Sequence, residues 1–346
     1  MSDRIRVGFV GAGENTRVKH IPGFRKIAGV ELAGVVNRSR GSSALVAKEF
    51  GIPRVFDRWE DLVADPAIDA VCIGTWPCLH APVTVAALEA GKHVLCEARM
   101  AMDAEEARRM LEASRRRPDR VAQLVPSPLM MGPDAAIHET IRSGRLGDLL
   151  AVDVHFCTGA FLDRVSPMTW RQDARVSGLN AMAMGIVYET LMRWIGPARS
   201  VAALSRVFVP RRRGPDGAEV EIRVPDHLEI LCEFAPAAVG HLRFSAVAGK
   251  GPDNAAWLHG SEGTLRADFK AQTVHFAARG AEGFADVTPP RAGWAGWRVE
   301  EEFIGAIRGT ERVRFTTFED GVRYMDFTAA VARSAAERRT VDLSAS

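Results

Sequence analysis

A glycine-rich turn near the amino terminus is the first place where residue types and spacing point to chemistry. The run Gly11-Ala12-Gly13-Glu14-Asn15-Thr16 lies between an apolar stretch, residues 4–10, and a stretch with helical spacing, residues 17–27. Glycines permit a tight turn and let the backbone approach a pyrophosphate, whose charge is favoured at the amino end of the following helix. Thr16 stands where a third Gly or Ala is usual, so an ordinary strand-to-helix turn is the alternative. We expect Gly11, Gly13, Glu14 and Asn15 to hold a nicotinamide dinucleotide.

A second polar group follows the next apolar run, residues 30–36. In dinucleotide folds an acid at this point accepts the ribose 2′-hydroxyl of NAD. The sequence instead has Asn37, Arg38 and Ser39, and the last two can bind a 2′-phosphate. This predicts NADP as the cofactor, or NAD, with a plain polar turn as the alternative.

The elements that would position these residues alternate between strand and helix. Apolar runs predict strands over residues 4–10, 30–36, 54–56, 69–74, 93–96 and 120–125. Helical spacing covers residues 17–27, 42–50, a helix capped by Asp57, 83–89 and 103–117. Because the strands are apolar on both faces, they indicate a parallel sheet covered by helices. We therefore predict an α/β Rossmann domain over residues 1–125.

The pattern changes in the remainder of the chain, residues 126–346. Predicted helices cover residues 134–143, a run that ends at Gly196, and segments near 297–307 and 318–336. Predicted strands cover residues 149–156, 201–209, 227–234, 239–248, 255–260 and 263–269. Segments 211–219 and 280–296 are expected to be loops, and the runs Arg115–Arg117 and Arg211–Arg213 to be solvated faces. This predicts an α+β domain with a largely antiparallel open sheet that binds substrate and supports oligomerisation.

Five short motifs occur in this order along the chain. They are DAVCIGTWPCLH (69–80), AGKHVLCE (90–97), SGRLG (143–147), WR (170–171) and DGVRYM (320–325). With the glycine turn, they resemble the glucose–fructose oxidoreductase, inositol dehydrogenase and rhizopine catabolism (Gfo/Idh/MocA) family. The resemblance implies a homodimer or tetramer that uses the open sheet. It also implies cofactor contacts from Thr75, Trp76, His80, Glu97, Trp170 and Arg171, although His80 and Trp170 are equally well read as core residues.

The sequence departs from the family where that family places its chemistry. Members usually carry Glu-Lys-Pro where this chain has Glu97-Ala98-Arg99. Three polar residues, Asp, His and Asp, usually follow on a later helix, where this chain has Ala183, Val187 and Thr190. Because alcohol oxidation needs a base to remove a proton, the usual alcohol-to-ketone chemistry is not expected to run in the usual way.

Three nearby residues are candidate substitutes for the missing acid–base groups. Tyr188 lies one helical step from Val187, Arg99 supplies a positive charge, and His155 lies on the strand before the active-site segment. For each of them, a purely structural role is the alternative.

Composition narrows the classes of partner. Lys plus Arg number 45 against 43 Asp plus Glu, a net charge of +2, so neither nucleic acid nor an anionic membrane is indicated. The five cysteines are scattered without a Cys-x-x-Cys pair, so we expect neither disulfides nor a metal site. With no signal-peptide pattern and no apolar run of ~20 residues, the cytoplasm is the expected location.

Three functions fit these observations. The first is an NAD(P)-dependent oxidoreductase of a sugar, polyol or related cyclic compound with a non-standard active site. The second is a glycosidase or lyase that keeps its cofactor and works by transient oxidation. The third is a non-catalytic NAD(P)-binding regulator.

Overall fold

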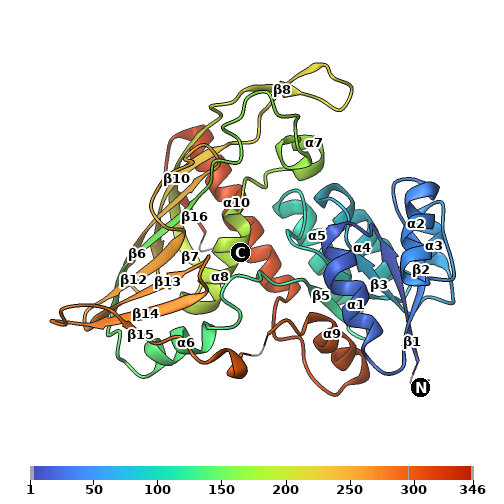
Figure 1. The fold of residues 1–346 in the computed structure, drawn as a ribbon, viewed down its shortest axis with the longest axis horizontal. Helices are drawn as coiled ribbons and strands as arrows, with labels where there is room; N and C mark the ends of the chain where they lie inside the picture. The colour runs from blue at the N-terminus through green and yellow to red at the C-terminus, as the bar shows by residue number, and fades with distance from the viewer. Residues whose placement is uncertain (1–3, 295, 344–346) are drawn as a thin grey trace. The chain divides into compact units, whose positions relative to one another are not determined.

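The chain forms two compact units, each built from two separate stretches of sequence (Figure 1). The computed structural model describes residues 4–294 and 296–343. The first unit comprises Met1–Pro126 and Arg298–Met325, and the second comprises Ser127–Trp297 and Asp326–Ser346. The first change of unit falls beside the boundary expected at residue 125. The sequence did not indicate that residues 298–325 belong with the amino-terminal stretch.

The first unit contains a five-stranded sheet in the order β2-β1-β3-β4-β5. Every neighbouring pair is parallel, which confirms the predicted Rossmann sheet. The strands are β1 (Ile5–Val10), β2 (Val30–Val36), β3 (Ala70–Ile73), β4 (His93–Cys96) and β5 (Ala122–Leu124). The expected strand at residues 54–56 is a single bridge between Val35 and Val55.

Helices cover both faces of this sheet, as two adjacent residues of β1 show. A Cβ on Gly8 would lie 2.7 Å from Leu62 of α3, whereas the ring of Phe9 lies 6.0 Å from that of Phe24 in α1. Neighbouring strand residues point to opposite faces, so α3 and α1 lie on different sides. The helical segments are η1 (Thr16–His20), α1 (Ile21–Arg25), α2 (Arg40–Phe50), α3 (Trp59–Ala64), η2 (Pro77–Leu79), α4 (His80–Glu89), α5 (Ala104–Arg116) and α9 (Val299–Arg308).

One predicted helix cap is wrong. The residue at the amino end of α3 is Arg58, and its side chain makes no capping hydrogen bond. Asp57, expected to cap this helix, instead pairs with the exposed Arg40 at 2.7 Å. The cap of α5 is present, since Asp103 accepts a hydrogen bond from the backbone N–H of Glu106 at 2.9 Å.

The second unit contains a nine-stranded sheet in the order β15-β14-β13-β12-β6-β11-β10-β7-β16. Its neighbours are antiparallel except for β6 and β11, which confirms the largely antiparallel sheet. The strands are β6 (Leu149–Cys157), β7 (Ala198–Arg206), β10 (His227–Phe234), β11 (Ala238–Ser245), β12 (Ala255–Gly260), β13 (Gly263–Asp268), β14 (Thr273–Ala278), β15 (Ala285–Asp286) and β16 (Val341–Asp342). The helical segments are α6 (Asp134–Arg142), η3 (Trp170–Gln172), α7 (Ala174–Ser177), α8 (Met184–Ile195), η4 (Arg291–Gly293) and α10 (Phe318–Glu337), whose second half belongs to this unit.

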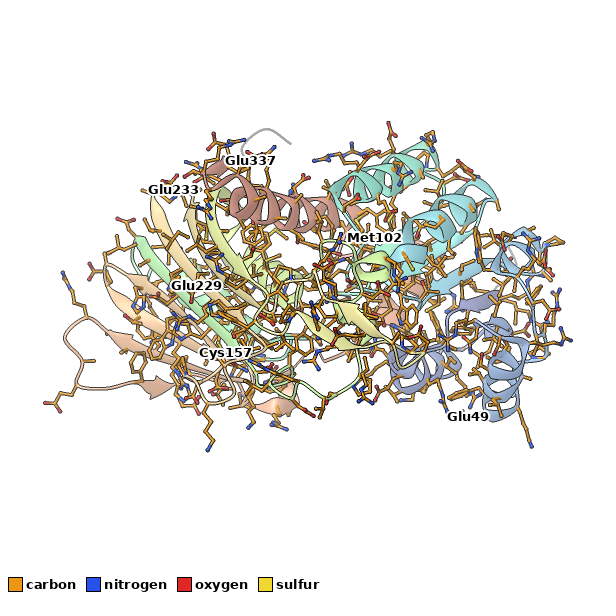
Figure 2. The ribbon with its side chains drawn as sticks, turned by 90° about the horizontal axis from the view of Figure 1, so that it is seen from above. Glu49, Met102, Cys157, Glu229, Glu233 and Glu337 are labelled. Carbon is orange, nitrogen blue, oxygen red and sulfur yellow. The ribbon has the colours of Figure 1, made fainter. Side chains whose placement is uncertain are left out.

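The two faces of this sheet differ in cover. On β10, Leu228, Ile230, Cys232 and Phe234 are buried, and Figure 1 shows α8 and α10 along one face. The alternate residues point to the other face; Glu229 and Glu233 are labelled among them in Figure 2. This second face is open within the described chain.

Two loop expectations need correction. Within residues 211–219, β8 (Arg211–Arg213) pairs with β9 (Glu219–Glu221) as a small hairpin. Its central arginine is not solvated: Arg212 is buried and donates hydrogen bonds to the backbone carbonyls of Phe161, Asp163 and Ser166. Because Arg211–Arg213 are three consecutive charged residues, the sequence indicated a solvated segment, whereas the structure has a strand whose middle residue points inward. The stretch 280–296 contains β15 and η4, and residue 295 lies outside the described residues.

A buried ionic network fixes α8 to the start of the second unit. Arg193 of α8 lies 3.1 Å from Asp134 and 3.4 Å from Glu189, and its guanidinium also donates to the carbonyl of Leu129. Asp134 additionally accepts from the indole N–H of Trp194 at 2.7 Å. Asp134 therefore serves two donors from adjacent residues of one helix.

We predict that Asp134→Ala lowers the free energy of unfolding by about 3–5 kcal/mol, because the buried Arg193 loses its shorter carboxylate contact and keeps the longer one to Glu189, and the indole N–H of Trp194 loses its acceptor. Chemical denaturation followed by tryptophan fluorescence measures this. Glu139→Ala, which removes an exposed partner of Arg142, should cost at most about 1 kcal/mol. Equal losses in the two variants would contradict the role given to the network.

Candidate nucleotide-binding and active site

The glycine turn closes over the carboxyl end of β1. Gly11 has φ +81°, and a Cβ there would lie within 2.9 Å of Thr75 and Gly74. A Cβ on Gly13 would meet only the carbonyl of Gly74, at 3.7 Å, and Gly13 is exposed. Gly11 is thus needed to form the turn, whereas Gly13 leaves open space beside it. This space, next to the amino end of η1, fits a pyrophosphate.

Asn37 acts on the turn from the end of β2. Its side-chain oxygen accepts the backbone N–H of Ala12 at 2.6 Å, and its own N–H donates to the Ser43 hydroxyl at 2.8 Å. A cavity of about 570 Å³ lies beside it, lined by Ala12, Arg17, Asn37, Ser42, Leu45, Val46, Lys48 and Glu49. The adenosine half of a dinucleotide belongs on this side of the turn.

Arg38 and Ser39 continue this edge. Arg38 is exposed, and its guanidinium lies 5.9 Å from the ring centre of Trp76. Ser39 directly precedes α2 as its N-cap, and its hydroxyl accepts the N–H of Ser42 at 3.3 Å. The fold therefore brings together Arg38, which follows β2, and Trp76, which follows β3.

His80 joins the segments that follow β3 and β4. Its Nδ1 lies 2.9 Å from the carbonyl of Arg99, and its Nε2 lies 3.1 Å from that of Thr75. Burial lowers the pKa of His80 in spite of both carbonyls. Since His80 and Arg99 are both buried, these contacts favour the structural interpretation of His80.

Glu97, directly after β4, meets two residues that follow the glycine turn. Its carboxylate accepts from the side-chain amide of Asn15 and lies 2.9 Å from Nε2 of the fully buried His20. The other ring nitrogen of His20 lies 2.5 Å from a carboxylate oxygen of Glu300 in α9. Neither His20 nor Glu300 was predicted from the sequence. Their signals, a polar residue within a helical run and an acidic helix start, did not distinguish them from surface residues.

Tyr188 lies in the core of the second unit. It is 1% exposed, and its ring stacks on that of Phe327 with 3.6 Å between centres. Its hydroxyl accepts the backbone N–H of Ala198 at 2.8 Å, and burial raises its pKa. These contacts favour packing over the acid–base role expected from the sequence.

The other acid–base candidate in this unit lies on the opposite face of the sheet. His155 is aligned with Arg243, which pairs with Glu229 at 2.7 Å on the open face. Tyr188 belongs to α8, which lies along the face of the sheet to which Cys232 points. The sheet therefore separates His155 from Tyr188, and the two are not brought together.

The remaining predicted contacts in the second unit lie on η3. Trp170 is half-buried, and the Arg171 guanidinium lies 4.4 Å from its ring centre. This stacking presents an arginine and an indole side by side.

Helix α8 offers no accessible acid or base at the positions where the family usually has one. Ala183 and Val187 lack polar side chains. The buried Thr190 hydroxyl lies 2.8 Å from that of Ser127 and donates to the carbonyl of Ile186. Glu189 is buried too, and accepts the N–H of Ser127 at 2.7 Å.

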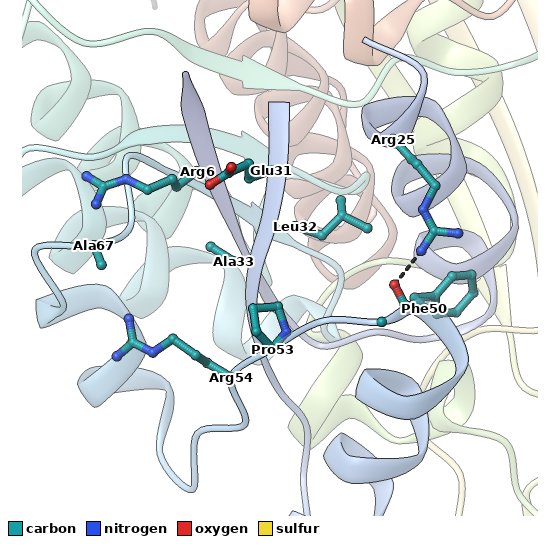
Figure 3. Close-up of a pocket in the computed structure, with 10 residues that line it drawn as sticks. Arg6, Arg25, Glu31, Leu32, Ala33, Phe50, Pro53, Arg54 and Ala67 are labelled. Carbon is teal, nitrogen blue, oxygen red and sulfur yellow. Dashed lines mark hydrogen bonds between the residues drawn. The ribbon is translucent and has the colours of Figure 1, made fainter. Parts of the chain in front are cut away.

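A further cavity lies away from this edge (Figure 3). It measures about 630 Å³ and is bordered by Arg6, Glu31 and Leu32, near the amino ends of β1 and β2. Arg6 is held there by Asp69 at 2.8 Å. Ligands of parallel α/β sheets bind at the carboxyl ends, so this cavity is not the cofactor site.

Two absences hold for residues 4–294 and 296–343. No helix there is both long and apolar enough to cross a membrane. No group of three or more His, Cys, Asp or Glu side chains in that part is placed to hold a metal ion.

Comparison with known proteins finds relatives that are named as a dehydrogenase and a reductase. Levoglucosan dehydrogenase of Pseudarthrobacter phenanthrenivorans is 27% identical over 240 residues, 64% of this chain and 61% of that protein. The 1,5-anhydro-D-fructose reductase of Ensifer adhaerens is 36% identical over 153 residues, 43% of this chain and 44% of that protein. This chain thus matches less than two thirds of the length of these curated relatives.

Comparison of structures covers nearly the whole chain. A levoglucosan dehydrogenase in complex with NADH and L-sorbose superposes with a TM-score of 0.86 at 24% identity, covering 98% of this chain and 99% of that one. Residues 5–124 match the family model of the oxidoreductase family with an NAD-binding Rossmann fold, and residues 135–266 match the GFO/IDH/MocA carboxyl-terminal domain. The chain therefore belongs to the Gfo/Idh/MocA oxidoreductase family.

Proposed function

We propose that this protein is an NAD(P)-dependent oxidoreductase that acts on a sugar, polyol or related cyclic compound. The open space beside Gly13, at the carboxyl edge of the Rossmann sheet, is the observation that carries the proposal. The substrate class is supported by relatives named levoglucosan dehydrogenase, 1,5-anhydro-D-fructose reductase and inositol 2-dehydrogenase.

Different residues at this edge would bind different parts of the cofactor. A bound nicotinamide ring supplies hydride transfer. Gly11 and Gly13 shape the pyrophosphate cradle, Asn37 holds that cradle by its bond to Ala12, and Arg38 is free to reach a 2′-phosphate from the surface. Asn15 and Glu97 lie on the other side of the turn, where the second nucleotide half belongs.

The buried state of Val187, Glu189 and Thr190 favours a non-standard chemistry on the substrate side. Two other functions are compatible with the same observation. One is a glycosidase or lyase that works by transient oxidation, and the other is a non-catalytic cofactor-binding regulator. A thermal-shift screen of sugars and polyols against the cofactor-loaded protein should find a stabilising compound. Net formation or consumption of NAD(P)H with that compound would support the oxidoreductase. Turnover without net redox change would support the glycosidase or lyase, and binding without turnover would support the regulator.

We also propose that the protein is a homo-oligomer that uses the open face of the nine-stranded sheet. Three aliphatic side chains of this sheet are more than half exposed: Leu204 at 58%, Leu231 at 54% and Val239 at 56%. Leu231 belongs to the open face with Glu229, so this face is partly apolar. An apolar sheet face in water is stabilised by cover, and a second copy of the chain would provide it.

We predict that Gly13→Val abolishes dinucleotide binding but leaves the fold intact, because the side chain would occupy only the cofactor's space. Calorimetry should show at least a 100-fold loss of affinity with an unchanged melting temperature. Gly11→Ala is the matched control: it should lower the melting temperature, because φ is +81° and the Cβ would clash with backbone. Retained affinity in Gly13→Val would place the pyrophosphate elsewhere.

We predict that Tyr188→Phe lowers stability by about 1–3 kcal/mol, because the buried N–H of Ala198 loses its acceptor. Turnover of the screened substrate should stay within about threefold of the original protein. A fall of 100-fold or more in kcat at unchanged stability would restore the acid–base role predicted from the sequence.

We predict that Arg38→Ala weakens NADP binding by about one to two decades, the worth of a charge-assisted hydrogen bond of roughly 1.5–3 kcal/mol. NAD affinity should not change. Arg40→Ala, two residues away and paired with Asp57, should affect neither cofactor. If Arg38→Ala weakens NAD and NADP by the same factor, the predicted preference for NADP is wrong.

A further inference from the structure

An arginine and a tryptophan from neighbouring strand ends meet at the carboxyl edge of the Rossmann sheet. Arg38 is the second residue after β2, and Trp76 is the third residue after β3. The guanidinium carbon of Arg38 lies 5.9 Å from the centre of the indole ring, within the range of about 6 Å over which a guanidinium and an aromatic face attract each other. Both side chains are exposed, so the pair is accessible to a ligand.

The other polar side chains that follow β2 already have partners. Asn37 accepts the backbone N–H of the glycine turn, and Ser39 caps α2. Arg40 donates two hydrogen bonds to Asp57, at 2.8 and 2.7 Å. Arg38, by contrast, makes no hydrogen bond or ion pair with any residue that the structure describes. Its N–H donors can therefore all be offered to a ligand.

The backbone fixes the position of Trp76. Pro77 follows it, and a residue before proline favours the extended region, in agreement with its φ of −79° and ψ of 156°. Its carbonyl accepts the N–H of Leu79 at 3.0 Å, and the preceding carbonyl, of Thr75, lies 3.1 Å from Nε2 of the buried His80. An indole has only two side-chain torsions, whereas an arginine side chain has much more rotamer freedom. The indole is therefore the rigid member of the pair.

The pair belongs to the same edge as the glycine turn. A Cβ on Gly11 would lie 2.6 Å from Cγ2 of Thr75 and 2.8 Å from its backbone nitrogen, and Thr75 directly precedes Trp76. In dinucleotide-binding folds, an arginine near the end of the second strand accommodates the 2′-phosphate of NADP. A guanidinium forms paired hydrogen bonds to phosphate in a defined orientation, so its order before binding affects the affinity.

We propose that Trp76 is a positioning residue for NADP: its indole orders the guanidinium of Arg38 before the cofactor binds, so the preference for NADP over NAD depends on both side chains together. This inference rests on the proposed function, because it needs a dinucleotide at this edge. Ordering one flexible side chain in advance makes binding about 2- to 10-fold tighter. Since NAD has no 2′-phosphate, this gain applies to NADP alone.

A double-mutant cycle tests the coupling between the two side chains. Calorimetry gives the ratio of NADP⁺ to NAD⁺ affinity for the original protein, Trp76→Leu, Arg38→Ala and the double variant. Trp76→Leu should lower this ratio about 2- to 10-fold, whereas the same change in the Arg38→Ala background should leave the ratio unchanged. Trp76→Phe keeps an aromatic face, so its ratio should be closer to that of the original protein than the ratio of Trp76→Leu.

Phe50→Leu is the matched control (Figure 3). The Arg25 guanidinium lies 5.7 Å from the centre of the Phe50 ring, a separation close to that of the proposed pair. Arg25 also donates to the carbonyl of Phe50, and both residues line the cavity near the amino ends of β1 and β2. Loss of this ring should leave the affinity ratio unchanged. The control separates the loss of any arginine–aromatic contact from the loss of the one at the cofactor edge.

A measurement on the unchanged protein tests the same ordering if Trp76→Leu does not fold. In the cofactor-free protein, the indole should shift the Cδ proton resonances of Arg38 upfield, and the Nε–H of Arg38 should show restricted motion. NMR with the Arg38 resonances assigned from Arg38→Ala measures both. Unshifted resonances together with unrestricted motion would contradict the inference.

The binding results also distinguish this inference from the proposed function. The inference fails if Trp76→Leu leaves the ratio unchanged, if it lowers the ratio equally with and without Arg38, or if the original protein does not prefer NADP. Equal falls in NADP and NAD affinity would show that the indole acts without Arg38, as a stacking surface for adenine. In all these cases a dinucleotide still binds, and the proposed function stands. If the original protein binds neither dinucleotide, the proposed function and the inference both fail.

Discussion

A single buried charge sets the main constraint on the first unit. An imidazolium without exposed surface is stable only beside opposite charges, and His20 finds them in Glu97 and Glu300. These residues come from the start, the middle and the end of the chain, so the Rossmann sheet is not a self-contained amino-terminal half. Residues 298–325 belong to the first unit, and α9 contributes one of the two carboxylates as well as Phe303, whose ring lies 6.2 Å from that of Phe24.

The second unit uses its polar residues differently. On α8, Tyr188, Glu189 and Thr190 all bond to neighbouring segments, and none is more than 3% exposed. At the cofactor edge, by contrast, Gly13, Glu14, Asn15 and Arg38 remain exposed. Polar groups whose hydrogen bonds are already satisfied inside the fold contribute stability and order rather than recognition.

Local pattern was enough to predict the architecture. Continuous apolar runs separated by helical spacing specify a buried parallel sheet, and alternation along residues 227–234 specifies a half-covered one. The glycine turn could be placed because its function depends on residues adjacent in sequence. The hairpin of β8 and β9 was missed because Arg212 satisfies its donors on carbonyls about 50 residues away, which no local pattern records.

The surroundings of the candidate acid–base residues also depend on partners that are distant in sequence. A helical step of ~100° places Tyr188 near the direction of Val187, but that angle does not say what packs against the ring. The ring of Phe327, from another helix, stacks on the Tyr188 ring, and the backbone N–H of Ala198 donates a hydrogen bond to the Tyr188 hydroxyl. The sequence did not single out His20 and Glu300, because the importance of each residue depends on an oppositely charged partner that is distant in sequence. A local pattern can therefore indicate the glycine turn, which one segment forms, but not the cluster of His20, Glu97 and Glu300, which needs three segments.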